Sequence, residues 1–244
     1  MKLFRIKALL LILTALTIAS CSSAKNEENR SVDKVFQDAV EKFNKDELLE
    51  AQSDFDIIKI QYPASQYADD AQFYLAEISY KRELYIQSAF NYNYLRRMYP
   101  GSDYVKTSLY KAAMSYYQLS PPFDRDQDYT RKAIQAFQEF QYLYPEDSLT
   151  SEAGAKIIEL REKLAEREFF TATLYMKMDS PKSAVIYYNA VIDNFNDTKF
   201  YEDAIYGKIQ ALKLMNKNEE ARAAMETYKK KFPAGKHISE LEKL

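Results

Sequence analysis

Cysteine, histidine, glycine and tryptophan are scarce in this sequence, and each shortage excludes a class of function. The 244 residues include one Cys, one His, four Gly and no Trp. A common zinc site needs several Cys or His ligands, and a phosphate-binding loop needs closely spaced glycines. The chain also has no GxSxG nucleophile motif. We therefore expect no catalysis, no catalytic residue, no cofactor and no metal. The lack of Trp argues against a helical carbohydrate-capturing lipoprotein with Trp platforms.

Basic and acidic residues are nearly equal in number and are mixed along most of the chain. There are 34 Lys and Arg residues against 36 Asp and Glu residues, a formal net charge of −2, and the two signs are interspersed. Binding to DNA or RNA needs a basic stripe or patch. We therefore expect no nucleic-acid partner.

The first 20 residues are typical of a bacterial lipoprotein signal peptide. A basic start, Lys2 to Lys7, precedes an apolar stretch of 12 residues, Ala8–Ala19. A membrane-spanning helix needs about 20 residues, so this stretch suits a cleaved signal instead. It ends in Ile18-Ala19-Ser20-Cys21, which resembles a lipobox. The sequence therefore predicts removal of residues 1–20 and attachment of lipid, including palmitate-like acyl chains, to Cys21.

Lipidation of the single cysteine has three consequences. The mature protein cannot form a disulfide bond, so packing alone must stabilise it. Several acyl chains on one residue anchor a protein to a membrane durably. Loss of Lys2, Arg5 and Lys7 leaves 31 basic residues against 36 acidic ones, a net charge of about −5. The polar residues 21–30 predict a flexible, lipid-anchored tether ahead of the folded domain.

A five-fold repeat dominates the rest of the sequence. Each copy starts its pattern with a small residue: Ala51, Ser88, Ala133, Ala184 and Ala221. Four positions later comes a large apolar residue: Phe55, Tyr92, Phe137, Tyr188 and Met225. Seven positions later comes another: Ile58, Leu95, Phe140, Val191 and Tyr228. Eleven positions later the residue is always aromatic: Tyr62, Tyr99, Tyr144, Phe195 and Phe232. A helix breaker follows it: Pro63, Pro100, Pro145, Asn196 and Pro233.

Offsets of 0, 4, 7 and 11 residues place these side chains on one face of a helix, which the breaker then ends. A second amphipathic helix precedes each, with alanine twelve positions earlier at Ala39, Ala76 and Ala172. This spacing is typical of the tetratricopeptide repeat, or TPR. We therefore predict an all-α superhelical solenoid of about five TPR-like helix hairpins. The predicted repeats cover residues 31–63, 64–100, 101–145, 146–196 and 197–233, and residues 234–244 form a capping segment.

Two long intervals between breakers locate insertions. We expect one to be a loop from Ser120 to Asp128 and the other to lengthen the first helix of repeat four, from Ser148 to about Lys177. Hydroxyl residues after the breakers, Ser65, Ser102 and Thr198, suit the N-caps of the following helices. The single histidine, His237, has no Cys or His companion and is expected on the surface.

Aromatic residues provide a candidate surface for binding a peptide. In TPR folds the first helix of each pair lines the groove, and six residues lie one turn from the alanine position: Phe36, Phe43, Phe73, Tyr80, Tyr110 and Tyr117. Such a surface suits an extended segment with apolar and aromatic side chains. Packing of these rings between helices is the alternative interpretation.

Several motifs go beyond a generic TPR protein. Two breaker junctions share the pattern Tyr-Pro-x-Ser-x-Tyr, at residues 62–67 and 99–104. The inserted loop holds the run Asp124, Arg125, Asp126, Gln127. Together with the lipobox, these features resemble the BamD family of outer-membrane assembly lipoproteins. We expect Asp124 and Asp126 to cap the following helix and Arg125 to hold the insertion in place.

The resemblance implies a lipoprotein on the periplasmic face of the outer membrane, in the β-barrel assembly (BAM) machinery. Its partners would be the POTRA domains of a BamA-like barrel insertase and the C-terminal segments of unfolded outer-membrane proteins. The alternative is another TPR lipoprotein scaffold of the cell envelope, coordinating peptidoglycan or division. Partners recovered from native membranes would distinguish the two.

Overall fold

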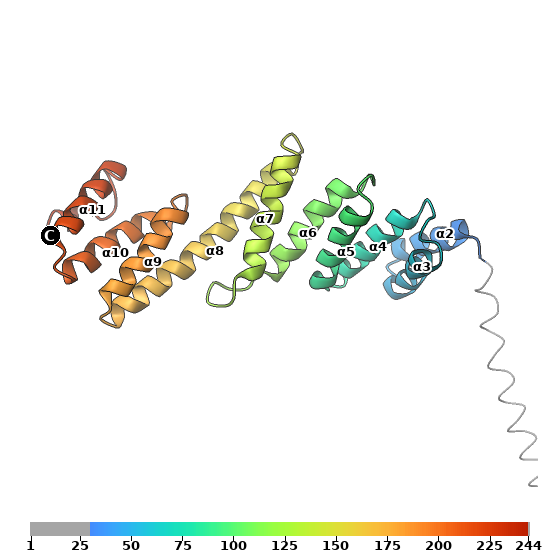
Figure 1. Cartoon of the computed structure of the whole chain (residues 1–244), viewed down its shortest axis with the longest axis horizontal. Helices are drawn as coiled ribbons and strands as arrows, with labels where there is room; N and C mark the ends of the chain where they lie inside the picture. The colour runs from blue at the N-terminus through green and yellow to red at the C-terminus, as the bar shows by residue number, and fades with distance from the viewer. Residues whose placement is uncertain (1–29, 244) are drawn as a thin grey trace, which may run out of the picture. The chain divides into compact units, whose positions relative to one another are not determined.

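A computed structural model describes residues 30–243, so the predicted signal peptide, Cys21 and residues 22–29 lie outside the described range. Within that range every regular element is an α-helix (Figure 1). The helices are α2 (Val32–Asn44), α3 (Leu48–Gln61), α4 (Ala68–Lys81), α5 (Tyr85–Met98), α6 (Val105–Leu119), α7 (Asp128–Leu143), α8 (Thr150–Lys177), α9 (Pro181–Asn194), α10 (Phe200–Leu214), α11 (Asn218–Lys231) and α12 (Ile238–Leu241).

The described residues form two compact units, one ending at Ile78 and the other beginning at Ser79. In the first unit, α2, α3 and the start of α4 enclose one apolar core. Its centre consists of fully or almost fully buried side chains: Val35, Ala39, Ala51, Phe55, Ile58, Ala71, Leu75 and Ile78. Burial of these side chains provides most of the stability of this unit.

Ion pairs of a buried carboxylate also stabilise the first unit. Asp54 on α3 is 3% exposed, and its two oxygens lie 3.0 Å from Arg30 and 2.5 Å from Lys42. Arg30 is also 3.3 Å from Asp38. Pairing with two cations compensates the cost of removing the Asp54 charge from water. Arg30 thereby fixes the start of the folded domain to α3.

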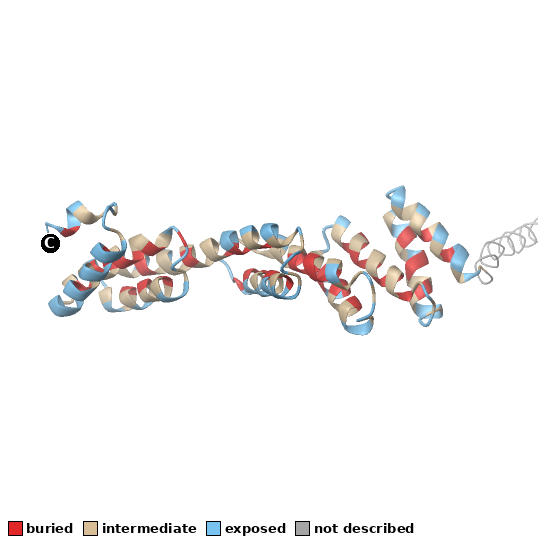
Figure 2. Cartoon of the chain, turned by 90° about the horizontal axis from the view of Figure 1, so that it is seen from above, coloured by how far each residue is buried: buried red, intermediate tan, exposed pale blue. Residues whose placement is uncertain are grey.

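In the second unit, helices pack mainly on their neighbours in the chain. Each of α5 to α10 packs on the helix that follows it, and α10 also contacts α8. Burial follows stripes along the helices, with exposed residues on their outer sides (Figure 2). Consecutive hairpins of this kind are the arrangement expected of a repeat protein. The all-α, TPR-like hairpin array and the long first helix of repeat four, the 28-residue α8, are confirmed.

The repeat columns take the structural places that the sequence predicts for them. The five small residues are at most 2% exposed, and the residues seven positions later are fully buried. Each aromatic residue eleven positions later is the C-cap of its helix, and its N–H donates to the carbonyl four residues earlier. The breaker follows directly. These two columns therefore specify packing, and the aromatic one specifies the helix end.

The predicted N-cap role of the hydroxyl residues is wrong. α4, α6 and α10 begin at Ala68, Val105 and Phe200, two or three residues after the hydroxyls. Two of the hydroxyls instead stabilise the turn between helices. Ser102 Oγ accepts from the N–H of Tyr104 at 3.2 Å, and Thr198 Oγ1 donates to the carbonyl of Phe195 at 2.7 Å. Their preference for turns dominates over their preference for helix starts.

His237 is partly buried rather than a simple surface residue. Its ring stacks on Tyr206 at 4.0 Å, and Nε2 lies 2.7 Å from Asp203 Oδ1. Burial opposes ionisation of Asp203, but hydrogen bonds from His237 and Lys236 outweigh it and lower the pKa of this carboxyl. These contacts fix the short α12 to α10, and Leu241 of α12 is 1% exposed.

Candidate protein-binding site

In the first unit, the predicted groove residues belong to a cluster of aromatic rings centred on Tyr74. Phe36 and Phe43 of α2 meet the Tyr74 ring edge-on, at 6.3 and 5.0 Å between centroids. Phe73 lies beside it at 6.1 Å. Tyr74 in turn stacks on the buried Phe55 at 4.8 Å. The structure thus brings Phe36 and Phe43 together on Tyr74 as a common aromatic base, and Phe73 contacts the same ring as its neighbour in the chain.

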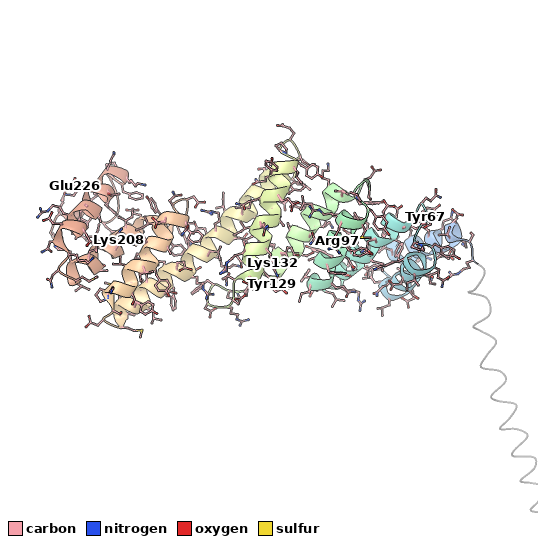
Figure 3. The ribbon with its side chains drawn as sticks, in the orientation of Figure 1. Tyr67, Arg97, Tyr129, Lys132, Lys208 and Glu226 are labelled. Carbon is pink, nitrogen blue, oxygen red and sulfur yellow. The ribbon has the colours of Figure 1, made fainter. Side chains whose placement is uncertain are left out.

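These three rings are half-buried, so each packs between helices and also contributes to the surface. Phe36 is covered on one face by Tyr67, which stacks on it at 4.3 Å. Tyr67, labelled in Figure 3, donates its hydroxyl to Asp33 Oδ1 at 2.9 Å, and this hydrogen bond raises the pKa of Tyr67. The sequence pattern did not single out Tyr67 and Tyr74 as binding residues. Tyr67 directly precedes α4 and Tyr74 lies on it seven residues later, and that spacing could have identified the pair.

In the second unit, Tyr80 and Tyr117 are half-buried and each lies beneath a lysine. Lys111 Nζ is 5.2 Å from the Tyr80 ring centre, and Lys156 Nζ is 4.2 Å from that of Tyr117. The Tyr117 hydroxyl donates to Glu159, 2.7 and 2.8 Å from the two carboxylate oxygens. Burial raises the pKa of Tyr117, and Glu159 adds to the effect. Both rings are held in place by charged neighbours.

Tyr110 is a core residue. It is 7% exposed and meets Phe137 and Phe140 edge-on at 5.8 and 5.2 Å. Burial raises the pKa of its hydroxyl strongly, and the Glu152 carboxylate adds to this. Tyr110 is therefore part of the core, and little of its ring area contributes to the surface. Its spacing matches that of a groove residue, but the helix α7 covers it.

The insertion loop is organised by the buried amide of Gln127. Gln127 is fully buried, and its Nε2 donates to the carbonyls of Pro122 at 2.8 Å and Arg125 at 3.0 Å. Its Oε1 accepts from Thr130 at 2.7 Å. The amide thus closes the loop and joins it to the first turn of α7.

The other residues of the motif have smaller parts in this loop. The prediction that Asp124 and Asp126 cap α7 is wrong, because the N-cap is Gln127 and neither aspartate caps the helix. Asp126 accepts a hydrogen bond from the N–H of Asp128 at 3.0 Å within the loop, and Asp124 is exposed. Arg125 is held through its backbone carbonyl, which also accepts from Arg167 of α8. Lys163 of α8 donates to Ser120 Oγ at 2.8 Å, and burial lowers the pKa of this lysine. The long helix α8 thereby supports the loop.

Gln127→Leu is expected to lower the free energy of unfolding by about 1–2 kcal/mol, because it leaves buried carbonyls without their donor. Urea unfolding followed by circular dichroism measures this loss. Trypsin should also cleave after Arg125 faster than in the parent protein. Asp124→Ala, at an exposed position of the same loop, is the control and should change neither quantity. Equal behaviour of the two variants would contradict the role of Gln127.

From Arg30 to Lys243, no His, Cys, Asp and Glu side chains gather in a group of three that could hold a metal ion. Over the same residues, no helix is both long and apolar enough to cross a membrane.

The geometry defines a class of protein: a TPR-like helical-repeat protein that presents aromatic rings at its surface. The model of the YfiO family, described as outer membrane lipoprotein, matches residues 28–238. The chain belongs to this family, the BamD/YfiO outer membrane lipoproteins.

Relatives named outer membrane protein assembly factor BamD match almost the whole chain. The protein of Rickettsia prowazekii is 22% identical over 241 residues, covering 98% of this chain and 96% of the relative. That of Pasteurella multocida is 24% identical over 244 residues, covering 95% and 92%. Among solved structures, a tetratricopeptide repeat protein from Parabacteroides merdae is 15% identical, with a TM-score of 0.41 over 82% of this chain and 79% of that one.

Proposed function

We propose that this protein is a non-catalytic lipoprotein subunit of a BAM-type machinery that inserts β-barrel proteins into the outer membrane. It binds a BamA-like insertase through the POTRA domains and receives the C-terminal segments of unfolded outer-membrane proteins. The lipid on Cys21 holds it on the periplasmic face of the outer membrane. The observation that carries this proposal is the match to BamD assembly factors along nearly the full length of both chains.

Recovery of partners from native membranes tests the proposal. The full-length protein, tagged at its C-terminus, is purified in mild detergent, and co-purifying proteins are identified by mass spectrometry. We expect a barrel protein with POTRA domains at near-equal amounts. Recovery of division or peptidoglycan-binding proteins without such a barrel would favour the other envelope scaffold and refute the assembly role.

The aromatic cluster of the first unit is the proposed site for the substrate segment. Half-buried rings offer apolar faces to an aromatic side chain, and an aromatic pair contributes about 0.5–1.5 kcal/mol beyond its buried area. The double variant Phe43→Ala/Phe73→Ala is expected to weaken binding of a peptide ending in an aromatic residue about tenfold or more. Fluorescence anisotropy of a labelled peptide measures the affinity.

Leu49→Ala is the control for this prediction. Leu49 is 62% exposed on α3, and the substitution removes a similar apolar side chain outside the aromatic cluster. We expect its affinity to match that of the parent protein. Equal losses in the control and the double variant would argue against the cluster as the binding site.

Cys21→Ala is expected to release the protein from membranes, because it removes the predicted attachment point of the acyl chains. After cell fractionation and a high-salt wash, the variant should appear in the supernatant and the parent protein in the pellet. The circular dichroism spectrum should stay helical, since Cys21 precedes the folded residues. A variant that stays in the pellet would contradict lipid anchoring through Cys21.

A further inference from the structure

The long helix α8 passes from one apolar core to another (Figure 1). Its first part packs on α6 and α7 in a core that includes Leu160, and its last part packs on α9 and α10 around Ala172. Between these two residues, Ala165 is the one buried side chain among the described residues 161–171 of α8. A helix segment with so few buried contacts can bend unless other contacts hold it.

The insertion loop contacts one face of this middle part of α8. Lys163, Arg167 and Phe170 follow each other at spacings of four and three residues, so they share that face. Lys163 and Arg167 donate hydrogen bonds to the loop, and the Phe170 ring meets Phe123 of the loop edge-on at 5.4 Å. Phe170 is 50% exposed, so this ring pair lies at the surface, outside both apolar cores.

The turn between α9 and α10 contacts the opposite face of the same part of α8. Arg161 lies two residues before Lys163, which places its side chain about 200° away around the helix axis. Its guanidinium donates to both carboxylate oxygens of Asp197, at 2.6 and 2.7 Å, and to the carbonyl of Asn194 at 2.7 Å. The hydrogen bonds from Arg161 lower the pKa of Asp197. A bidentate pair of this kind fixes direction as well as distance.

We propose that the insertion loop, residues 120–128, holds the middle of α8 in a fixed direction and thereby sets the angle between the α6–α7 hairpin and the α9–α10 hairpin. Each hairpin contacts the same part of α8 through the segment that joins its two helices, and the two segments lie on opposite faces. Because the loop contacts are polar or lie at the surface, they can open while both apolar cores stay intact. The angle can therefore change without unfolding of either hairpin.

Distances between spin labels on the full-length protein test the proposal, which does not depend on the assembly function. Nitroxide labels at Tyr142→Cys on α7 and Ile186→Cys on α9, two positions that are 84% and 63% exposed, report the separation of the two hairpins. Pulsed electron paramagnetic resonance measures the distribution of label-to-label distances. The parent protein, treated with the same label, shows whether Cys21 contributes.

The variant Lys163→Met/Phe170→Ala is expected to broaden this distribution about twofold, because α8 can then bend between its two cores. Leu174→Ala/Lys177→Met is the matched control. It also removes one apolar and one basic side chain from α8, at exposed positions beyond the loop contacts. Its distribution should keep the width measured for the labelled protein without these substitutions.

Phe123→Ala tests the loop side of the contact and leaves α8 unchanged. It should broaden the distribution as much as Phe170→Ala alone, and the two substitutions together should add nothing further, since both remove one ring pair. An unchanged width in Lys163→Met/Phe170→Ala, even with faster trypsin cleavage after Arg125, would mean that α8 holds the loop without being held by it, and would overturn the proposal. Equal broadening in the control would overturn it as well. Cooperative thermal unfolding of each variant excludes misfolding as the cause.

Discussion

Phe137→Ala is expected to lower the free energy of unfolding by about 3–5 kcal/mol, since it removes a fully buried aromatic side chain. Phe137 is 0% exposed on α7 and belongs to a core that α6, α7 and α8 share. Its ring meets Tyr110 edge-on at 5.8 Å. Alanine would leave a cavity at the point where the three helices converge. The neighbouring rings are themselves packed, so they can fill this cavity only in part.

Urea unfolding followed by circular dichroism measures this loss, and Tyr142→Ala is the matched control. Tyr142 lies on the same helix but is 84% exposed, so its substitution should change stability by less than about 0.5 kcal/mol. In an array of hairpins the damage should also be local. Amide exchange should therefore accelerate in α6 to α8 more than in α11. A loss below 1 kcal/mol would contradict the placement of Phe137 in the core.

Much of the fold could be predicted from the sequence because the same pattern of packed residues occurs in five copies of the repeat. A residue such as Ala133 is small in each copy because two helices approach closely there. The aromatic residue before each breaker is always the helix C-cap, as at Tyr62. One helix pair alone would leave these positions ambiguous. Agreement between copies separates the positions that packing requires from those that merely happen to be apolar.

The site was harder to predict, because spacing gives the face of a helix but not what covers that face. Phe73 and Tyr110 have equivalent positions in their repeats, yet Phe73 is half-buried, whereas Tyr110 lies under α7 and is 7% exposed. Conversely, Ile86 and Phe90 look like ordinary core positions, but no described element buries them, and they stay 62% and 60% exposed. Which apolar face stays exposed to solvent depends on contacts between helices that are distant in the sequence. Local periodicity carries no information about these contacts.

The role of Gln127 was also hidden, for a different reason. The sequence analysis assigned the contact that holds the loop in place to Arg125. The structure gives it to the buried amide, which can donate and accept at once and so pairs with two carbonyls and one hydroxyl. The charged neighbours Asp124 and Arg125 remain exposed. In a tight loop the buried backbone carbonyls need hydrogen-bond donors. Burying a neutral amide costs less free energy than burying a charge.

Gly207→Leu is expected to destabilise the second unit by at least about 2 kcal/mol, because α9 and α10 touch at this glycine. A Cβ at Gly207 would lie 2.4 Å from Cζ of Tyr188 and 2.7 Å from its hydroxyl oxygen. The Tyr188 ring is 4% exposed, so it has little room to move, and the same burial raises the pKa of its hydroxyl to about 12. Overpacking costs about 3 kcal/mol or more at such a site, and leucine regains about 1 kcal/mol as the better helix former.

Gly101→Leu is the control, because a Cβ at Gly101 would meet no heavy atom within 4 Å. It should leave the free energy of unfolding within about 0.5 kcal/mol of the parent value. A double-mutant cycle identifies Tyr188 as the obstacle. Once Tyr188→Ala has removed the ring, Gly207→Leu should cost at least about 1 kcal/mol less than it does alone. Additive losses would mean that another contact excludes the side chain, and that the close approach of α9 and α10 at Gly207 does not depend on Tyr188.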